Sequence, residues 1–484
     1  MNTIDTDTIA ALATASGKSG VCVVRVSGPL AKKIATTLLG FELKPRYAHF
    51  GNFTAADGQL LDQGIGLFFA GPASFTGEDV FEIQGHGGTS VQNLLLTRAL
   101  ELGARLARPG EFTERAFLND KIDLVQAEAI ADLIDASSTQ AAQSALRTLS
   151  GEFSKLVHHL VAELTKTRVN IEAAIDFSDE DIDIITESKV HDSLERLSSQ
   201  LETALQQANQ GSLLKEGMQV VIAGKPNAGK SSLLNALSGN DTAIVTDIAG
   251  TTRDLLSEKL QIDGMPIHIT DTAGLRESDD VVEQEGVRRA SEAMKASDRI
   301  LLVIDSAQTR SQDFTLCLDD IPPLLRERPE LLSKTLVVWN KADLLDHSSL
   351  GTSNTLEHSH KNKLSCPLPE GFVHAAHSGG TVESVIVSAK LQQGLDALRD
   401  ALKQTIGFNA SVEGAFVARE RHLIALRCAA NLVLSAQTAL KDGQPFELAA
   451  EDLRIAQQEL GTITGEVSSD DLLGEIFSNF CVGK

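Results

Sequence analysis

Residues 224–231 form a glycine-rich segment of the kind that surrounds phosphate groups. They read Gly-Lys-Pro-Asn-Ala-Gly-Lys-Ser and follow the apolar run 218–223, which predicts a buried strand. Helical spacing resumes at 232–237, so the segment joins a strand to the start of a helix. Gly224 and Gly229 have no Cβ atom, and the backbone can therefore wrap closely around an anion. Amide groups at the helix start would then face that anion, which predicts a phosphate site.

Four side chains or amides near this segment have the chemistry that a nucleoside triphosphate needs. Lys230 supplies a positive charge near the β- and γ-oxygens, and the Ser231 hydroxyl is the expected magnesium ligand. Asp271 ends a second apolar run, 266–270, and its carboxylate can hold a magnesium-bound water. The amide of Gly274, three residues later, can meet the γ-phosphate. The spacing predicts hydrolysis of a triphosphate.

Two later motifs are expected to bind the base of that nucleotide. They are Asn340-Lys341-Ala342-Asp343 and Ser388-Ala389-Lys390. The Asp343 carboxylate accepts hydrogen bonds from the two adjacent donors on the edge of guanine, whereas adenine presents an acceptor there. Asn340 and Lys341 pack the loop that carries Asp343. A guanine nucleotide is therefore predicted, and an ATPase is not.

The residue after the Asp-Thr-Ala-Gly turn cannot orient a water molecule. Small signalling GTPases carry a glutamine there, but this chain has Leu275. The acidic stretch 276–285 follows, and Glu283 within it is our candidate for the residue that positions the attacking water. On the residues alone, a solvated acidic loop is the favoured interpretation of this stretch.

A cation site is predicted beside the phosphates. Thr252 can complete the magnesium coordination, as a switch-type threonine. The side-chain carbonyl of Asn227, with backbone carbonyls from 246–251, could hold a monovalent cation that replaces an arginine finger. The alternative role of Asn227 is to pack the loop.

Composition limits the remaining classes of function. The 484-residue chain is long enough for about two to four domains. Its net charge of −23 excludes a protein that grips nucleic acid with its whole surface. The five cysteines show no paired spacing, so no disulfide framework or zinc site is expected. The N-terminus lacks signal-peptide features and no run approaches 18 apolar residues, so we expect a cytoplasmic protein without a membrane span.

The pattern along the chain predicts how domains are arranged. Strand patterns occur at 21–28, 65–70 and 79–84, and helical spacing occurs at 122–177, 190–208, 418–439 and 448–460. Helices on both sides of the nucleotide motifs predict an α/β P-loop GTPase domain inserted into an all-α helical domain, preceded by an α+β domain. The predicted bounds are 1–120, 121–216, 217–407 and 408–484. The His-rich stretch 346–384 is expected to be a solvated loop rather than a metal site.

These motifs, with two further blocks, resemble the bacterial MnmE (TrmE) family of tRNA-modification GTPases over nearly the whole chain. The blocks are Gly110–Lys121, which reads GEFTERAFLNDK, and the last four residues, which read Cys-Val-Gly-Lys. The 346–384 stretch is the main departure, because it looks longer than is usual in the family. The resemblance implies a homodimer that binds a formyl- or methylene-tetrahydrofolate in its N-terminal domain. It also implies a flavin-dependent partner, MnmG, with which the chain installs a carboxymethylaminomethyl or aminomethyl group at carbon 5 of the wobble uridine of tRNA.

The resemblance also implies roles for individual positions. It places potassium at Asn227, Thr246, Ile248 and Thr251, and magnesium at Ser231 and Thr252. It makes Glu283 the catalytic carboxylate, and it places folate contacts at Arg25, Glu82, Lys121 and Lys484. The full set of nucleotide and cation positions is Asn227, Ala228, Gly229, Lys230, Ser231, Ser232, Thr246, Asp247, Ile248, Ala249, Gly250, Thr251, Thr252, Asp271, Thr272, Ala273, Gly274, Asn340, Lys341, Ala342, Asp343, Ser388, Ala389 and Lys390.

Two alternatives stay open at this point. Cys481 could be a nucleophile near a one-carbon unit, or a small packed residue that holds the tail. The phosphate loop and the Asn-Lys-x-Asp motif also occur in GTP-switched ribosome-assembly factors, which are the alternative function. Such factors need a basic RNA-binding domain, whereas the C-terminal helices of this chain are acidic.

Overall fold

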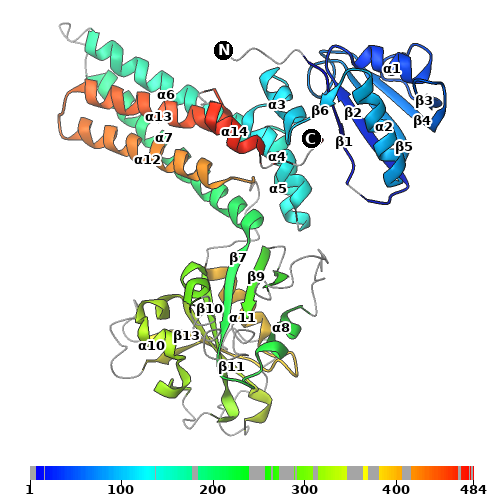
Figure 1. The fold of residues 1–484 in the computed structure, drawn as a ribbon. Helices are drawn as coiled ribbons and strands as arrows, with labels where there is room; N and C mark the ends of the chain where they lie inside the picture. Colours follow the sequence, from blue (N-terminus) through cyan, green and yellow to red (C-terminus); the bar gives the residue numbers. More distant parts are fainter. Residues whose placement is uncertain are drawn as a thin grey trace. The chain divides into compact units, whose positions relative to one another are not determined.

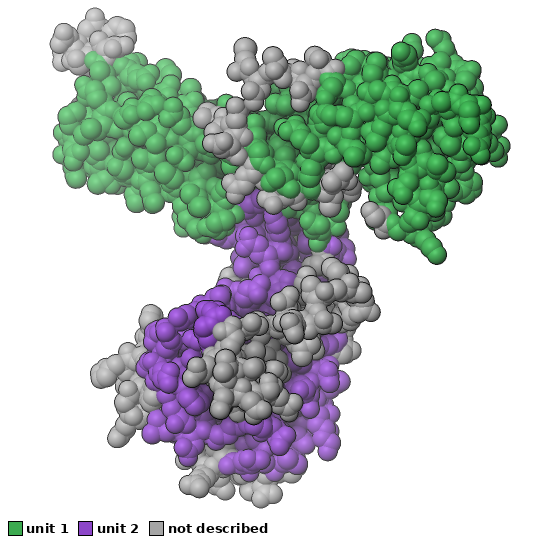
Figure 2. All heavy atoms as spheres, in the orientation of Figure 1, with its two compact units in different colours: residues 1–135, 145–205, 420–484 green, residues 136–144, 206–419 purple. Residues whose placement is uncertain are grey.

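The computed structural model describes two compact units of the chain. The described residues are 7–15, 17–136, 138–176, 184–238, 257–262, 265–271, 288, 291–308, 314–345, 363–368, 381–405, 416–466, 470–478, 480 and 483. Unit 1 comprises 1–135, 145–205 and 420–484, and unit 2 comprises 136–144 and 206–419 (Figure 2). Unit 1 is thus interrupted in sequence by unit 2. The domain bounds at 120, 216 and 407 remain predictions.

The N-terminal part of unit 1 is a six-stranded sheet in the order β3-β4-β5-β2-β1-β6 (Figure 1). Its strands are β1 (Ile9–Leu12), β2 (Val21–Ser27), β3 (His49–Thr54), β4 (Leu60–Phe69), β5 (Val80–His86) and β6 (Arg105–Leu106). Helices α1 (Ala31–Leu39) and α2 (Thr89–Glu101) pack on one face, against side chains that include Cys22, Val24 and Val26. Side chains alternate along a strand, so Arg25 of β2 lies on the other face.

The rest of unit 1 is helical. Its helices are α3 (Glu111–Leu118), α4 (Leu124–Asp135), α6 (Glu152–Asp176), α12 (Glu420–Lys441), α13 (Phe446–Thr464) and α14 (Asp470–Ser478), with most of α7 (Ile184–Glu216). Helix α13 packs against both α6 and α12. The structure confirms helices in the predicted region 122–177, where α4, α5 (Thr139–Leu149) and α6 follow one another. A left-handed Gly151 separates α5 from α6. The sequence pattern did not indicate α1, α2 or α14.

Helix α12 is strongly apolar. Among the described helices, it is the one whose length and composition would suit a membrane span. Its buried side chains recur at helical spacing and include Leu423, Leu426, Ala429 and Val433. We interpret α12 as a core helix of unit 1, since its apolar stripe packs against α13.

Unit 2 contains a seven-stranded sheet in the order β12-β13-β11-β10-β7-β9-β8. The strands are β7 (Met218–Ala223), β8 (Ser257–Ile262), β9 (Met265–Asp271), β10 (Arg299–Asp305), β11 (Thr335–Asn340), β12 (Lys363–Pro367) and β13 (Thr381–Ile386). The five central strands are parallel, and β8 and β12 are antiparallel edges. Alternate residues of β7 enter two separate apolar clusters, Val220 and Ile222 one and Val221 and Ala223 the other. Both faces of the sheet are thus covered, as parallel sheets require.

Helices cover the two faces of this sheet. Helices α8 (Lys230–Ser238) and α11 (Leu395–Thr405) contribute Leu233 and Leu398 to one cluster, and α10 (Pro323–Glu327) contributes Leu325 to the other. The unit is therefore the α/β P-loop fold that the sequence predicted.

The prediction that 346–384 is a loop was wrong in two places. Strand β13 begins at Thr381 and pairs in parallel with β11, and β12 pairs antiparallel with β13. Cys366 and Val382 are buried in the core of unit 2, and this burial stabilises strands in a stretch of unfavourable composition. The five histidines of the stretch lie outside the described residues. Where the structure does describe the chain, no group of three or more His, Cys, Asp or Glu could hold a metal.

Candidate functional site

The segment between β7 and α8 forms a tight loop in which two glycines are required. Gly224 has φ of 144°, and a Cβ atom there would collide with the carbonyl oxygen of Val303. Gly229 has φ of 91°, and a Cβ atom there would collide with the side-chain amide of Asn340. Asn227, the predicted potassium ligand, also has a left-handed φ of 62° and is exposed. The backbone therefore makes the close turn that an anion site needs.

Lys230 lies inside this loop and is 7% exposed. Its Nζ atom donates to the carbonyl oxygens of Gly224 and Lys225, both at 3.0 Å. A buried ammonium group must be hydrogen-bonded, and these carbonyls satisfy it while they hold its charge within the loop. Ser231 and Ser232 are exposed at the start of α8, where the Ser231 hydroxyl is accessible to a cation.

Asn340 connects the phosphate loop with the base-recognition motifs. Its amide nitrogen donates to the carbonyl oxygens of Ala228 at 3.1 Å and Gly229 at 3.3 Å. Its amide oxygen accepts a hydrogen bond from the backbone N–H of Ala389 at 3.1 Å. Because Asn340 is 1% exposed, all three bonds form in a buried environment where an unmade bond is costly. Three motifs that are distant in sequence are thus held together by one side chain.

The neighbouring residues orient the carboxylate that is expected to bind guanine. Ser388 Oγ donates to Asp343 Oδ1 at 2.6 Å, and Asp343 Oδ2 makes no hydrogen bond to another described residue. Lys341 has φ of 63°, and its Nζ atom lies 2.7 Å from Asp305 Oδ2. Asp343 therefore has a fixed orientation and a free oxygen, which suits a ligand edge with two donors. Ala342 and Ala389 are buried beside it, and Lys390 is exposed.

Strand β9, which ends at the predicted magnesium-site residue Asp271, also ends at this edge of the sheet. Asp271 is the last residue of β9 and is the register partner of Ile222 in β7. The carboxyl ends of parallel strands meet at one edge, so Asp271 lies beside the phosphate loop. The other predicted positions, Thr246, Asp247, Ile248, Ala249, Gly250, Thr251, Thr252, Thr272, Ala273, Gly274 and Glu283, lie outside the described residues.

In unit 1, two of the predicted folate positions form an ion pair. Arg25 of β2 and Glu82 of β5 are register partners on adjacent strands. The Nε and Nη2 atoms of Arg25 lie 3.0 and 2.9 Å from Glu82 Oε1. The Arg25 guanidinium lies over the rings of Phe75, at 5.6 Å, and Phe112, at 5.8 Å. Both charged side chains are partly exposed, so the pair is accessible on the sheet face opposite α1 and α2.

Of the other two predicted folate positions, the structure describes Lys121, whose side-chain stem lies near the same region. A Cβ atom at Gly77 would come within 3.3 Å of Lys121 Cδ, so the Lys121 stem lies against the segment that carries Phe75. Gly483 packs so closely on the backbone of Leu12 in β1 that a Cβ atom there would collide with it. Strand β1 pairs with β2, which carries Arg25. Lys484 and Cys481 lie outside the described residues.

The structure also shows a buried cluster of charged side chains that the sequence analysis did not predict. Glu111 is 1% exposed and accepts hydrogen bonds from Arg105 Nη2 at 2.6 Å, Arg115 Nη2 at 3.1 Å and the Arg108 amide at 2.7 Å. Burial raises the pKa of Glu111, but the bonds from Arg105, Arg108 and Arg115 outweigh it and lower the pKa to about 2. In the sequence, the i, i+4 spacing of Glu111 and Arg115 was the signal that could have indicated this ion pair. The cluster fixes α3, which leads to Lys121.

Comparisons with known proteins agree with this architecture. A protein-family model described as GTP-binding protein TrmE N-terminus matches residues 8–121, and one described as MnmE helical domain matches residues 124–481. Proteins named tRNA modification GTPase MnmE from Marinobacter nauticus and Pseudomonas paraeruginosa are each 53% identical to this chain over 480 residues. The alignments cover 99% of this chain and 99% of each relative. The chain belongs to the MnmE family of tRNA modification GTPases.

This MnmE family member therefore binds GTP, as the sequence motifs predicted, and is an enzyme of tRNA modification, as the family resemblance implied. The relative from Vibrio cholerae serotype O1 is also 53% identical and aligns over 99% of this chain and 100% of its own. Among solved structures, the FeoB G-domain from Methanococcus jannaschii aligns with 39% of this chain and 98% of its own. Its sequence identity is 18% and its TM-score is 0.23.

Proposed function

We propose that this MnmE family member couples potassium-stimulated GTP hydrolysis to modification of carbon 5 of the wobble uridine of tRNA. The product group is carboxymethylaminomethyl or aminomethyl, and the chain works with an MnmG-like FAD-dependent partner. The observation that carries the proposal is the position of Asn340, which holds the phosphate loop and the base motifs as one site. This site occurs in a chain 53% identical to tRNA modification GTPases over nearly its full length.

In the nucleotide site, each side chain has a defined task. Lys230 neutralises phosphate charge, and Asp343 accepts from guanine. Magnesium would be held by Ser231 and Thr252, and potassium by Asn227 with Thr246, Ile248 and Thr251. When bound, these cations stabilise the negative charge that develops during phosphoryl transfer. Glu283 is the residue proposed to position the attacking water.

A tetrahydrofolate derivative, 5-formyl or 5,10-methylene, is proposed to bind beside the Arg25–Glu82 pair, on the sheet face opposite α1 and α2. Both contacts from Arg25 reach Glu82 Oε1, while Oε2 makes no hydrogen bond to another described residue. Oε2 can therefore accept from the donor edge of a pterin without loss of the ion pair. The exposed ring of Phe75 provides an apolar wall, the buried ring of Phe112 supports the Arg25 guanidinium, and Lys121 and Lys484 would attract the anionic glutamate tail.

The proposal also includes assembly and location. We expect a homodimer formed through the N-terminal domain, a complex with the flavoprotein partner and tRNA, and a cytoplasmic location. The decisive experiment is nucleoside analysis of tRNA from cells that lack this chain. Loss of the carbon-5 modification at the wobble uridine, restored by the wild-type gene, supports the proposal. An unchanged nucleoside profile, with the chain instead sedimenting with ribosomal subunits, would favour the assembly-factor alternative.

A further inference from the structure

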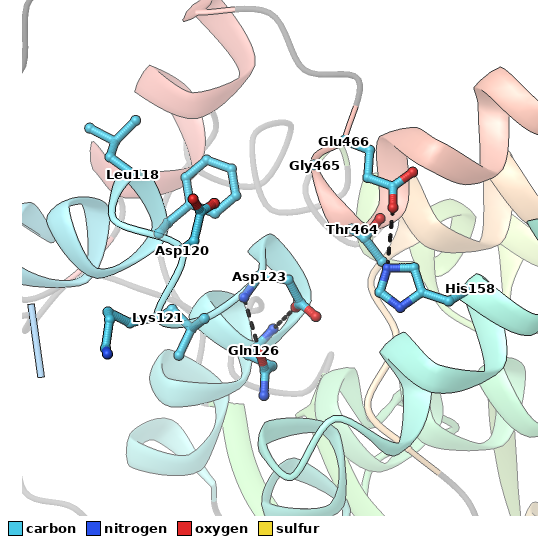
Figure 3. A pocket seen from close by; sticks show the side chains of 11 residues that line it. Leu118, Asp120, Lys121, Asp123, Gln126, His158, Thr464, Gly465 and Glu466 are labelled. Carbon is cyan, nitrogen blue, oxygen red and sulfur yellow. Dashed lines mark hydrogen bonds and ion pairs between the residues drawn. The ribbon is translucent and has the colours of Figure 1, made fainter. Parts of the chain in front are cut away.

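A cavity of about 430 Å³ lies in unit 1, between the link from α3 to α4, α6 and the end of α13 (Figure 3). Four of its lining side chains already have partners within the fold. Asp123 accepts from the Gln126 amide at 2.8 Å, and the Gln126 side chain accepts from the Asp123 amide at 3.1 Å. His158 lies 3.4 Å from Glu466. The cavity is therefore part of the packing of unit 1, and we assign it no ligand.

In unit 2, by contrast, a carboxylate outside the four nucleotide motifs contacts a residue within one of them. Asp305 is the last residue of β10, and its Oδ2 atom lies 2.7 Å from Lys341 Nζ in the base motif. Asp305 is the register partner of Asn340, so the ends of β10 and β11 bring it beside Lys341. The side chains are 10% and 30% exposed, and water therefore screens this pair less than an ordinary surface pair.

The Asp305 carboxylate is held in one orientation by the turn that follows it. Its Oδ1 atom accepts from the Ala307 amide at 3.1 Å, within the short helix η2 (Ser306–Gln308). The Ser306 hydroxyl donates to the carbonyl oxygen of Asn340 at 2.6 Å, in a buried environment. These two bonds fix η2 against the end of β11. Asp305 Oδ2 is thus presented to Lys341 by a rigid part of the fold.

The carbon chain of Lys341 lies along the phosphate loop. A Cβ atom at Gly229 would come within 3.8 Å of Lys341 Cε. The Lys341 backbone has a φ of 63°, which is uncommon for a residue other than glycine, and it begins the turn that carries Asp343. The lysine stem therefore spans the distance from that turn to the loop. A nucleotide with its phosphates in the loop and its base at Asp343 must extend its nucleoside part across the same span.

We propose that Asp305 is a positioning residue for nucleotide binding. It holds the Lys341 ammonium away from the phosphates, so that the lysine stem forms a wall for the nucleoside. Without this partner, a flexible lysine beside the loop would be attracted to the phosphate charge instead. The proposal rests on the proposed guanine site at Asp343, and it adds to that site a residue from outside the recognition motifs.

The test compares a ligand that has a nucleoside with one that does not. GDP and pyrophosphate each compete with a fluorescent GDP analogue for the full-length chain, at constant magnesium and potassium. In Asp305→Asn, the ratio of GDP affinity to pyrophosphate affinity should fall about tenfold, because a neutral amide oxygen holds the ammonium less strongly than a carboxylate does. The asparagine oxygen can still accept from the Ala307 amide, so the turn should remain in place.

Asp319→Asn is the matched control. It removes the same charge at an exposed position in the short helix η3 (Leu318–Asp320) of unit 2, and the ratio should stay as in wild type. A purely structural role of Asp305 would weaken GDP and pyrophosphate by the same factor. That result, or an unchanged ratio in Asp305→Asn, would overturn the proposal.

A second comparison shows whether Asp305 acts through Lys341. Lys341→Met keeps an unbranched side chain but removes the ammonium. In this background, Asp305→Asn should change the ratio less than about twofold, since no charge is left to hold. A further tenfold fall would mean that Asp305 acts without Lys341, and it would contradict the proposal.

Asp343→Asn separates this inference from the guanine site on which it rests. If that variant changes the base preference while Asp305→Asn leaves the affinity ratio unchanged, the role of Asp305 alone is wrong. If Asp343→Asn leaves the base preference unchanged, the guanine site is wrong and the role of Asp305 is rejected with it.

Discussion

The side-chain amide of Asn340 donates to the carbonyl oxygen of Gly229, 3.3 Å away inside the phosphate loop. The same nitrogen contacts Ala228 O, and the amide oxygen is bound by the Ala389 N–H. The residue that begins the base motif therefore also fixes the shape of the loop that holds phosphate. Changes at Asn340 should thus affect phosphate binding as well as base recognition.

Asn340→Asp tests this connection. The carboxylate keeps the acceptor for Ala389 but cannot donate, and it would face the carbonyl oxygens of Ala228 and Gly229. We expect GTP and GDP affinity to fall at least about tenfold, with a stability loss of about 1–3 kcal/mol in unit 2. Fluorescent-nucleotide titration and thermal denaturation measure the two effects. Asn431→Asp, an exposed change on α12, is the control, and equal nucleotide affinity in the two variants would contradict the prediction.

Base choice depends on Asp343. Asp343→Asn should weaken GTP and favour xanthosine triphosphate, because the amide can donate where the base of the latter presents an oxygen acceptor. The Ser388 hydroxyl, which now donates to Asp343 at 2.6 Å, can donate equally to the amide oxygen, so the loop should remain in place. Hydrolysis rates with the two triphosphates provide the measurement. A variant that still prefers GTP would argue against guanine recognition by this carboxylate.

Sequence predicted the parts of this site that depend on local residue order. The strand at 218–223, the glycine turn and the start of α8 are each set by neighbouring residues, and the structure has them at the expected places. The contact of Asn340 with Ala228 joins residues 112 positions apart and could not be inferred from spacing. Strand β12 escaped prediction because the burial of Cys366, rather than strand propensity, stabilises it. The Glu111 cluster was missed because its partner Arg105 comes from a separate strand.

Potassium should accelerate GTP hydrolysis relative to sodium. Asn227→Gly should remove this difference, because it deletes the side-chain carbonyl while glycine still accepts the φ of 62° at this position. Asn227→Asp retains an oxygen and is the matched control, which should keep much of the stimulation. Phosphate release at equal ionic strength in the two salts provides the measurement. If wild type hydrolysed GTP equally fast in both salts, the cation assignment would be wrong.

A change at the Arg25–Glu82 pair should affect folate binding but not GTP hydrolysis. Glu82→Gln should weaken binding of 5-formyltetrahydrofolate by about tenfold, because a neutral amide is a poorer partner for the pterin donors. GTP hydrolysis without tRNA should be unchanged, since Glu82 belongs to unit 1 and the nucleotide motifs to unit 2. Asp57→Asn, an exposed change in the same domain, is the control. Folate affinity equal to that of wild type would remove Glu82 from the site.

The low pKa of Glu111 predicts a pH-dependent contribution to stability. Its pKa falls from an ordinary 4.5 to about 2 in the folded chain, so the ionised carboxylate favours folding above pH 4.5, and this contribution is lost as the pH falls toward 2. The shift corresponds to about 3 kcal/mol at neutral pH. Glu111→Gln removes that contribution and leaves Arg105 and Arg115 with one charge partner fewer. The stability difference between wild type and variant should therefore be largest at pH 7 and shrink below pH 4.5.

Hydrogen exchange of the β1 amides, measured for both proteins across this range, reports the local opening free energy. Asp57→Asn should show no such pH-dependent difference, and a constant gap between wild type and Glu111→Gln would mean that the pKa of Glu111 is the same in the folded and the unfolded chain.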